Sequence, residues 1–352
     1  MKSLYKCISV SLLAMAGLTS CHNADNKFDD YEGGVTVYFP YQSPVRTLVM
    51  GEDTYNTDLD NAHKCKISAT MGGAYSGRDI KVDCAIDESI LNNLYFSSGE
   101  PIQVMPESYY TLSSTTIDFG GELTGSVELS LNDAFFEDDL AISGGYVIPL
   151  VMQSQTGADK INVGTYNTQT NSTAPQRTNS YAWEKTPKDF TLFCVKYISK
   201  FEGFFLRGIT KYNGKDSLRA EGKTCIDDPI VNTKTLGLNR VSYTVPNKLY
   251  EFDEQSNLVA RNVNHTIILT FDENQKCTLS APKDASYIVN GSGEYKDHGA
   301  VKAWGGKDRD ELMLSYTIID GADVISVEET LILQRRGVKL ETFDFIYKEG
   351  TK

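Results

Sequence analysis

The sequence predicts an all-β protein, with a β-sandwich in its first half and a β-barrel in its second. Three observations support this class. Short segments alternate apolar and polar residues, as a sheet with one buried face requires. Glycine pairs and Asn-Gly or Asp-Gly turns separate these segments. Helical periodicity is weak, and 352 residues are enough for two domains with separate cores.

The chain opens with the features of an export signal. Lys2 and Lys6 precede an apolar run over residues 8–18, which is too short to span a bilayer as a helix. The box Leu18-Thr19-Ser20-Cys21 resembles the lipobox of bacterial lipoproteins, which implies cleavage before Cys21 and lipidation of that residue. The alternative is an ordinary secretory signal that happens to contain a cysteine. We therefore expect a signal peptide over 1–20, an acidic tether over 21–32, and a lipid-anchored protein of the outer membrane, exposed at the cell surface.

Residues 33–155 contain about seven strand-like runs without helices between them. This pattern predicts an antiparallel β-sandwich of immunoglobulin type. The runs are Val35–Phe39, Arg46–Met50, Lys64–Met71, Ile80–Ile86, Tyr110–Phe119, Ser126–Leu131 and Tyr146–Met152.

Four motifs in this region resemble one family. They are the opening VTVYFP at 35–40, RTLVMGE at 46–52, MPESYYTL at 105–112 and the closing GYVIPL at 145–150. They are similar to the N-terminal β-sandwich domain of unknown function of Bacteroidetes surface lipoproteins, which is often encoded beside glycan-uptake genes. The resemblance implies a spacer or platform for a variable C-terminal module, and it carries over no catalytic residues.

Residues 156–188 are rich in Asn, Thr, Ser and Gln, and we interpret them as a polar linker between the domains. Tyr181 and Trp183 stand out there. An aromatic pair near a domain junction can bind the face of a sugar, or it can pack the linker against a domain. The second interpretation is favoured.

The barrel domain is expected over residues 189–350. Its eight strands form a meander, and closing a meander into an up-and-down barrel removes the exposed sheet edges. A second sandwich is the alternative. The runs are Phe190–Tyr197, Gly203–Tyr212, Arg240–Val245, His265–Phe271, Cys277–Ser280, Ser286–Tyr295, Glu311–Ile319 and Val324–Leu333.

The last hundred residues resemble calycin-like, lipocalin-related barrels. The similarity lies in a strand carrying Gly-x-Gly at 287–295, then Trp304, then DELMLSY at 310–316. Similar C-terminal domains of unknown function follow the sandwich in Bacteroidetes lipoproteins. The Gly-x-Trp of true lipocalins is absent, which argues against a calyx for hydrophobic ligands.

No motif in the sequence predicts a metal, a cofactor or an active site. The seven cysteines form no zinc pattern, and Cys65 and Cys84 occupy apolar strand positions, where buried thiols are favoured over a disulfide. Asp58-Leu59-Asp60-Asn61 lacks the glycine and distal glutamate of a calcium loop and is interpreted as a solvated acidic turn. Gly291-Ser292-Gly293 lacks the following helix and the lysine of a phosphate loop and is interpreted as a strand bulge. We predict a non-enzyme, with glycoside hydrolysis as a remote alternative.

Aromatic residues are the strongest functional signal, because sugars stack their C–H faces on aromatic rings. The chain has 20 Tyr, 15 Phe and 2 Trp. Trp304, in a glycine-rich loop, is predicted to be either a ligand platform or a lid on the barrel end. Tyr295 is expected on the same face, so the predicted ligand-binding residues are Trp304, Tyr295, Tyr181 and Trp183.

The net charge of −13 argues against nucleic acid and anionic lipid as partners. The family resemblance implies a surface glycan-binding component of a polysaccharide-uptake system, which would bind a glycan or a small molecule and work beside an outer-membrane transporter. The alternatives are a structural or adhesive protein that binds another protein, and a lipocalin-like carrier of a small apolar ligand.

Overall fold

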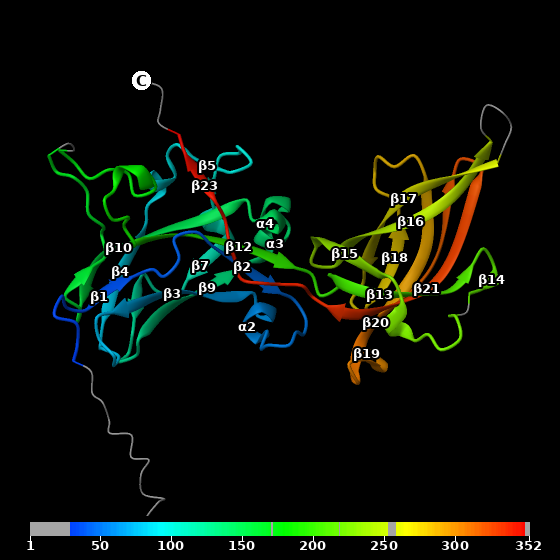
Figure 1. The fold of residues 1–352 in the computed structure, drawn as a ribbon, viewed down its shortest axis with the longest axis horizontal. Coiled ribbons are helices and arrows are strands. Elements are labelled where there is room, and N and C mark those ends of the chain that lie inside the picture. The colour runs from blue at the N-terminus through cyan, green and yellow to red at the C-terminus, as the bar shows by residue number, and fades with distance from the viewer. Residues whose placement is uncertain (1–28, 170–171, 218, 253–257, 349–352) are drawn as a thin grey trace, which may run out of the picture.

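The computed structural model describes residues 29–169, 172–217, 219–252 and 258–348. Its strands form two β domains that lie end to end along the long axis of the molecule (Figure 1). The predicted all-β class, with a barrel in the second half, is confirmed. Among the described residues, no helix has the length and the hydrophobicity needed to cross a bilayer.

The first domain is built on one curled sheet, so the walls of the expected sandwich are hydrogen-bonded parts of a single 12-stranded sheet. β6 (Gln103–Val104) pairs with β10, and β7 (Tyr110–Leu112) pairs with β9. The main path runs, in spatial order, through β11 (Lys160–Ile161), β1 (Thr36–Tyr38), β3 (Lys64–Gly72), β9 (Thr124–Leu131), β8 (Thr116–Asp118), β4 (Lys81–Ile86), β10 (Tyr146–Thr156), β12 (Phe190–Ile198), β2 (Pro44–Val49) and β22 (Glu341–Thr342).

Alternation of side chains places the core inside this curl. β3 buries Cys65, Ile67, Ala69 and Met71 and exposes or half-exposes the residues between them, as the period-2 pattern predicts. The helical elements are short. They are α2 (Asp58–Asn61), η2 (Glu88–Leu91), η3 (Glu107–Tyr109), α3 (Asp133–Phe136), α4 (Asp139–Ser143), η4 (Ser180–Ala182) and η5 (Cys225–Asp227).

β10 and β12 are buried on both faces. One face of each packs into the main core, and the other packs into a second apolar cluster that includes Val147 and Leu192. A two-stranded sheet of β5 (Leu94–Phe96) and β23 (Phe345–Tyr347) contributes to this second cluster. Since β22 and β23 both belong to the first domain, the end of the chain returns there after leaving the barrel.

The expected domain boundaries need correction. β12, predicted to open the barrel, pairs with β10 and with β2, so it completes the first sheet. The expected linker over 156–188 lies on the same domain, since the Gln176 side chain donates to the carbonyl oxygens of Ile90 (3.2 Å) and Asn92 (3.0 Å). The chain therefore passes to the second domain at residues 199–202. A run that is apolar on both faces indicates a buried strand and does not indicate which sheet contains it.

The second domain is an eight-stranded meander that closes when β21 pairs with β13. The eight include β15, which the sequence pattern missed, in place of β12. β14 (Lys215–Asp216) adds a short edge to β13. The barrel strands are β13 (Gly203–Tyr212), β15 (Ile230–Gly237), β16 (Arg240–Phe252), β17 (Leu258–Phe271), β18 (Lys276–Ser280), β19 (Ile288–Trp304), β20 (Lys307–Asp320) and β21 (Asp323–Arg335).

The barrel interior is filled by side chains, and most of them are apolar. A polar group lies among them. Arg207 Nε donates to Glu329 Oε2 at 2.5 Å, and the Tyr316 hydroxyl donates to Glu329 Oε1 at 3.0 Å. Burial and the Glu329 charge raise the pKa of Tyr316, so its hydroxyl stays protonated and keeps donating.

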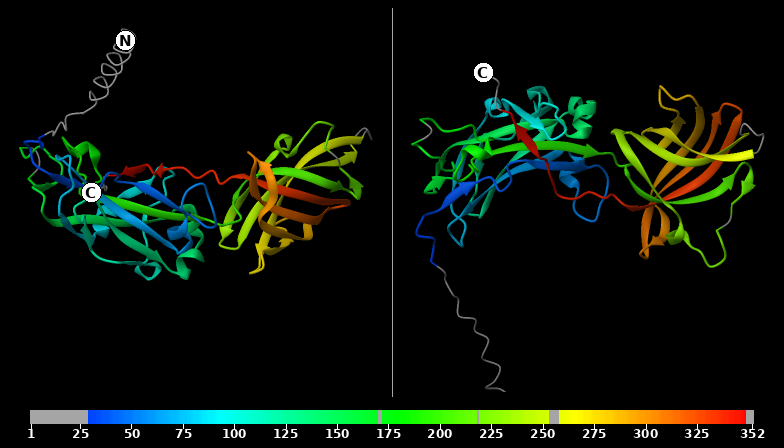
Figure 2. Two further views of the ribbon diagram at one scale, coloured as in Figure 1. Left: turned by 90° about the horizontal axis from the view of Figure 1, so that it is seen from below. Right: turned by 45° about the horizontal axis from the view of Figure 1, so that its top comes forward.

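Two segments join the domains, residues 199–202 and the segment that follows Arg336 (Figure 2). The Arg336 guanidinium donates to the carbonyl oxygens of Glu202 (2.6 Å), Ser199 (3.2 Å) and Met50 (3.3 Å), and so ties both segments to the loop after β2.

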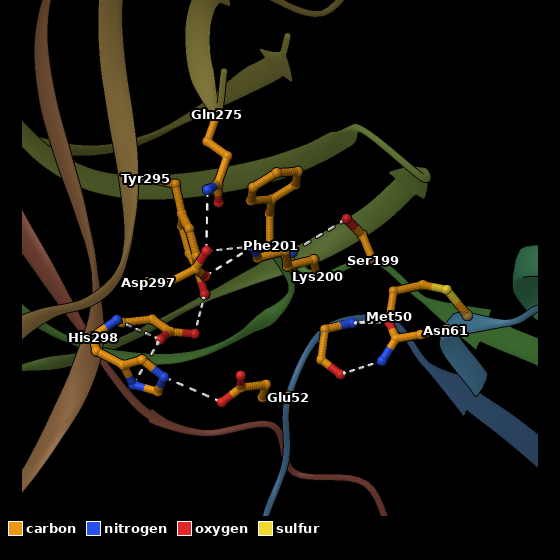
Figure 3. Close-up of polar contacts among 12 residues, drawn as sticks. Met50, Glu52, Asn61, Ser199, Lys200, Phe201, Gln275, Tyr295, Asp297 and His298 are labelled. Atoms are coloured by element: carbon orange, nitrogen blue, oxygen red, sulfur yellow. Dashed lines mark hydrogen bonds and ion pairs between the residues drawn. The ribbon is translucent and has the colours of Figure 1, made fainter. Parts of the chain in front are cut away.

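Two further polar contacts lie at this junction (Figure 3). Lys200 Nζ lies 2.8 Å from Asp297 Oδ1 of the barrel, and Glu52 Oε2 of the first domain lies 3.2 Å from His298 Nε2. The junction is thus a hydrogen-bonded contact between the two domains.

Candidate functional site

The structure separates the four predicted aromatic residues. Tyr181 lies in η4 on the first domain, and its side chain is fully exposed. Trp183 packs edge-on against Tyr166, with ring centroids 5.5 Å apart, and its Nε1 donates to the Gln176 carbonyl oxygen at 3.0 Å. Both partners of Trp183 belong to the same segment, so its side chain stabilises the fold of that segment.

Tyr295 and Trp304 do not share a ligand face. Tyr295 is 2% exposed, its hydroxyl donates to Asp310 Oδ2 at 2.7 Å, and its ring packs against Phe201. The expectation for Tyr295 is wrong because its strand position faces the barrel interior. Trp304 is half-buried at the end of β19, where it packs with Leu206 and Ile332 on the outer wall of the barrel. Cys21 lies outside the described residues.

Replacing Trp304 with alanine should therefore lower the free energy of unfolding of the barrel by about 1–3 kcal/mol, the loss expected for a partly buried aromatic side chain. Urea unfolding would measure the loss. Val301→Ala is the control, because Val301 is 70% exposed near the same hairpin, and its replacement should change stability by no more than about 0.5 kcal/mol. Unchanged stability in Trp304→Ala, with weakened ligand binding, would restore the platform interpretation.

The outer wall of the barrel carries a row of short polar side chains in register across six strands. Pairing aligns Thr270 with Thr278, Thr278 with Ser292, Ser292 with Ser315 and Ser315 with Glu328. Lys211 of β13 pairs with Glu328, and its Nζ lies 3.1 Å from the carboxylate. We call these six residues the hydroxyl row. Neighbouring strands lie about 4.8 Å apart, so the row extends about 24 Å around the barrel.

This part of the wall is hollowed. A depression of about 810 Å³, here called the waist groove, is lined by the hydroxyl row except Lys211, and by Met313 and Thr330 of the adjacent register row. A smaller depression of about 390 Å³ overlaps it and is lined by Asn290, Thr317 and Ser326 of the row on the other side. The waist groove and the hydroxyl row therefore lie at the same place on the outer wall.

Two glycines account for the hollow. Gly291 and Gly293 occupy inward positions of β19, next to β20. A Cβ at Gly291 would lie 2.5 Å from the Ser315 carbonyl oxygen, and one at Gly293 would lie 2.6 Å from Leu314 Cδ2. Without these side chains the wall can bend toward the barrel axis. The Gly-Ser-Gly motif thus lies within a strand and is not a phosphate loop, but the predicted bulge is wrong, because the pairing of β19 with β20 continues without a shift from Ile288 to Lys296.

The four hydroxyl groups of the hydroxyl row are free to bind a ligand. Within the described residues, no side-chain hydrogen bond joins Thr270, Thr278, Ser292 or Ser315 to another protein group, although Thr317 and Ser326 in the next row bond each other at 3.1 Å. Each hydroxyl can donate one hydrogen bond and accept two. Met313 gives the groove an apolar contact point, so the site has the chemistry for a polyhydroxylated ligand.

Other titratable groups have structural roles. Among the described residues, no three His, Cys, Asp or Glu side chains are placed to hold a metal ion. Asp60 is not solvated as predicted, because it is buried, pairs with Arg46 and accepts from the Val49 N–H at 3.0 Å. Cys65 and Cys84 are buried free thiols, and burial raises the pKa of each to about 12.

A pattern of short polar residues in the sequence indicates the waist groove, but the predicted site was based on aromatic residues alone. The middle of the outward phase of β19, β20 and β21 carries short polar side chains, such as Ser292, Ser315 and Ser326. Solvated strand faces commonly carry Lys, Arg and Glu instead. The alignment of these residues across strands depends on register, which the sequence alone did not provide.

Comparison with known proteins finds a matching family model for each domain. The domain of unknown function DUF5627 matches residues 200–337, which span the barrel, and a model described as a "-like, N-terminal domain" matches residues 28–159. No protein of curated function matches the chain. Nothing in these matches points to catalysis.

Three solved Bacteroides ovatus structures resemble the chain. Two of them match this chain only weakly. One, of unknown function, has 8% identity and a TM-score of 0.37 over 87% of this chain and 94% of its own. The other, from strain ATCC 8483 and provisionally named as carbohydrate-binding, has 12% identity and a TM-score of 0.24 over 69% and 66%.

The third structure, a structural genomics protein of unknown function, is 34% identical, with a TM-score of 0.78 over 91% of this chain and 100% of its own. The chain therefore belongs to the same family as this Bacteroides ovatus protein, with a DUF5627 domain as its barrel.

Proposed function

We propose that this protein is a lipid-anchored, non-catalytic glycan-binding protein of the cell envelope and that the waist groove holds the glycan. The observation that carries the proposal is the hydroxyl row, because short hydroxyls without protein partners lie at the floor of an open depression. Sugars present many hydroxyls, which such side chains can bind as donors and as acceptors. An uptake system that uses an outer-membrane transporter would be its setting.

The barrel interior offers little support for the alternative of an apolar carrier. The Arg207–Glu329 pair and the apolar core fill the space in which a lipocalin-like ligand would lie. The alternative of a protein partner has one observation in its favour. Ile288, Ile319 and Val324 lie in register beyond the groove, and Ile288 and Val324 are more than half exposed.

The anchor fits this arrangement. The first described residues lie at the end of the first domain away from the barrel (Figure 2), so an anchor at Cys21 would hold the first domain between the membrane and the barrel that carries the groove. Cys21→Ala should abolish incorporation of labelled palmitate and move the protein to the soluble fraction. Equal labelling of wild type and variant would contradict the anchor.

Filling the groove should abolish binding. Ser315 is exposed at the centre of the hydroxyl row, and Ser315→Trp would occupy the space of a ligand without entering the core. Electrophoresis in native gels containing neutral polysaccharides should show retardation of wild type, and the variant should lose at least about tenfold in affinity, or roughly 1.4 kcal/mol.

Ser242→Trp is the matched control, because Ser242 is a half-buried serine on β16 that faces away from the interior and does not line the groove. Its retardation should match that of wild type, and melting curves should show that both variants are folded. Equal retardation of wild type and Ser315→Trp would reject the groove as the site.

A further inference from the structure

We infer that the waist groove takes a neutral, extended polysaccharide that lies across the strands rather than along them. This inference rests on the proposed function and adds the orientation and the charge class of the ligand. It follows from three properties of the groove: the direction in which its chemistry repeats, its charge, and the strength of a single contact.

The chemistry of the wall repeats only across the strands. In that direction the hydroxyl row presents Thr270, Thr278, Ser292 and Ser315, one hydroxyl for each strand spacing of about 4.8 Å. Along β20, by contrast, the outward side chain changes from Met313 to Ser315. A polymer with repeating hydroxyls meets equivalent partners only when it crosses the strands.

The charges in the groove nearly balance. Lys211 pairs with Glu328, and Lys276 of β18 is the register partner of Glu294. Glu329 also lines the groove but is paired with Arg207 inside the barrel, and Asp272 is the remaining carboxylate of the lining, so the groove has a slight negative excess within a chain of net charge −13. An anionic polymer would be repelled. The groove therefore suits a neutral chain.

A single contact in this groove is weak. No aromatic side chain projects from the outward positions of the hydroxyl row, so binding depends on hydrogen bonds and on contact with Met313. One hydrogen bond tightens binding by roughly two- to twelvefold. Affinity should therefore be built from several sugar units and should rise with chain length until the row is filled.

The experiment is isothermal calorimetry of the full mature chain with cello-, xylo- and manno-oligosaccharides, each as disaccharide and hexasaccharide. For at least one series we expect the hexasaccharide to bind at least about tenfold more tightly than the disaccharide. Thr270→Ala, at one end of the row, should weaken the hexasaccharide roughly two- to twelvefold and leave the disaccharide unchanged. An oligogalacturonate hexamer should not bind.

The outcomes separate this inference from the proposed function. If disaccharide and hexasaccharide bind equally and Ser315→Trp abolishes both, the groove binds sugar, but the chain does not cross the strands. If the oligogalacturonate binds as tightly as the neutral hexamers, the inference that the groove selects a neutral polysaccharide is wrong. If no wild-type binding occurs in any series, or if Ser315→Trp binds as wild type does, the proposed site fails and this inference fails with it.

Discussion

Replacing Glu329 with alanine should lower the free energy of unfolding of the barrel by about 3–5 kcal/mol. Glu329 is 2% exposed and accepts from Arg207 and from the Tyr316 hydroxyl. Its removal leaves the Arg207 guanidinium buried without a countercharge, which costs more than the lost attraction. Urea unfolding, followed by tryptophan fluorescence and by circular dichroism, would measure the change.

The adjacent residue on β21 provides the control. Glu328 pairs with Lys211 on the outer wall, where both side chains are about half exposed. Glu328→Ala should therefore cost only about 0–1 kcal/mol. Replacing both members of the inner pair, as Arg207→Met with Glu329→Leu, should recover much of the stability lost in Glu329→Ala. Equal effects of Glu328→Ala and Glu329→Ala would contradict the buried role of Glu329.

The second large effect is expected at the junction. Arg336→Ala removes a buried cation that binds three carbonyl oxygens, one from the first domain and two from the segment 199–202 that connects the domains. The Ser199 carbonyl oxygen keeps the Glu202 N–H as a donor, and each of the other two carbonyls left without a partner costs about 1–3 kcal/mol, so the junction should lose at least about 2 kcal/mol. We expect a single thermal transition to separate into two, and small-angle scattering to report a wider range of domain orientations.

Arg335→Ala is the matched control for Arg336. Arg335 is exposed, and its guanidinium stacks on the Phe204 ring at 4.1 Å, a contact worth about 0.5–1 kcal/mol. The variant should keep the single transition of wild type. If wild type already shows two thermal transitions, or if Arg336→Ala still shows one, the junction does not couple the unfolding of the two domains.

The sequence predicted the barrel well because the alternation of β19, β20 and β21 is strong and their turns are recognisable. It failed at β12 and β15 for different reasons. Phe190–Ile198 is apolar on both faces, a pattern that predicts a buried strand without naming its sheet. Ile230–Gly237 has mainly Asn, Thr and Lys between a few apolar residues, and its buried positions are Thr233 and Thr235.

The candidate site was harder to predict than the fold. Tyr295 follows the inward phase of Val289, Gly291 and Gly293, so alternation alone could have excluded it from the surface. The hydroxyl row was not predictable in this way, because β13 and β21 change register at irregularities, and these decide that Lys211 is aligned with Glu328. A one-residue shift would have placed a different set of side chains there.

The double connection between the domains also has a mechanical consequence. A ligand pulled away from an anchored protein would load the barrel, and the load would reach the first domain through two covalent paths at once. One path enters β12, which points toward the barrel (Figure 1) and lies between β10 and β2, so tension along it shears two ladders of hydrogen bonds simultaneously. The other enters β22, on the far side of β2. Tension is thereby divided between strands of one sheet, and neither ladder can open one bond at a time.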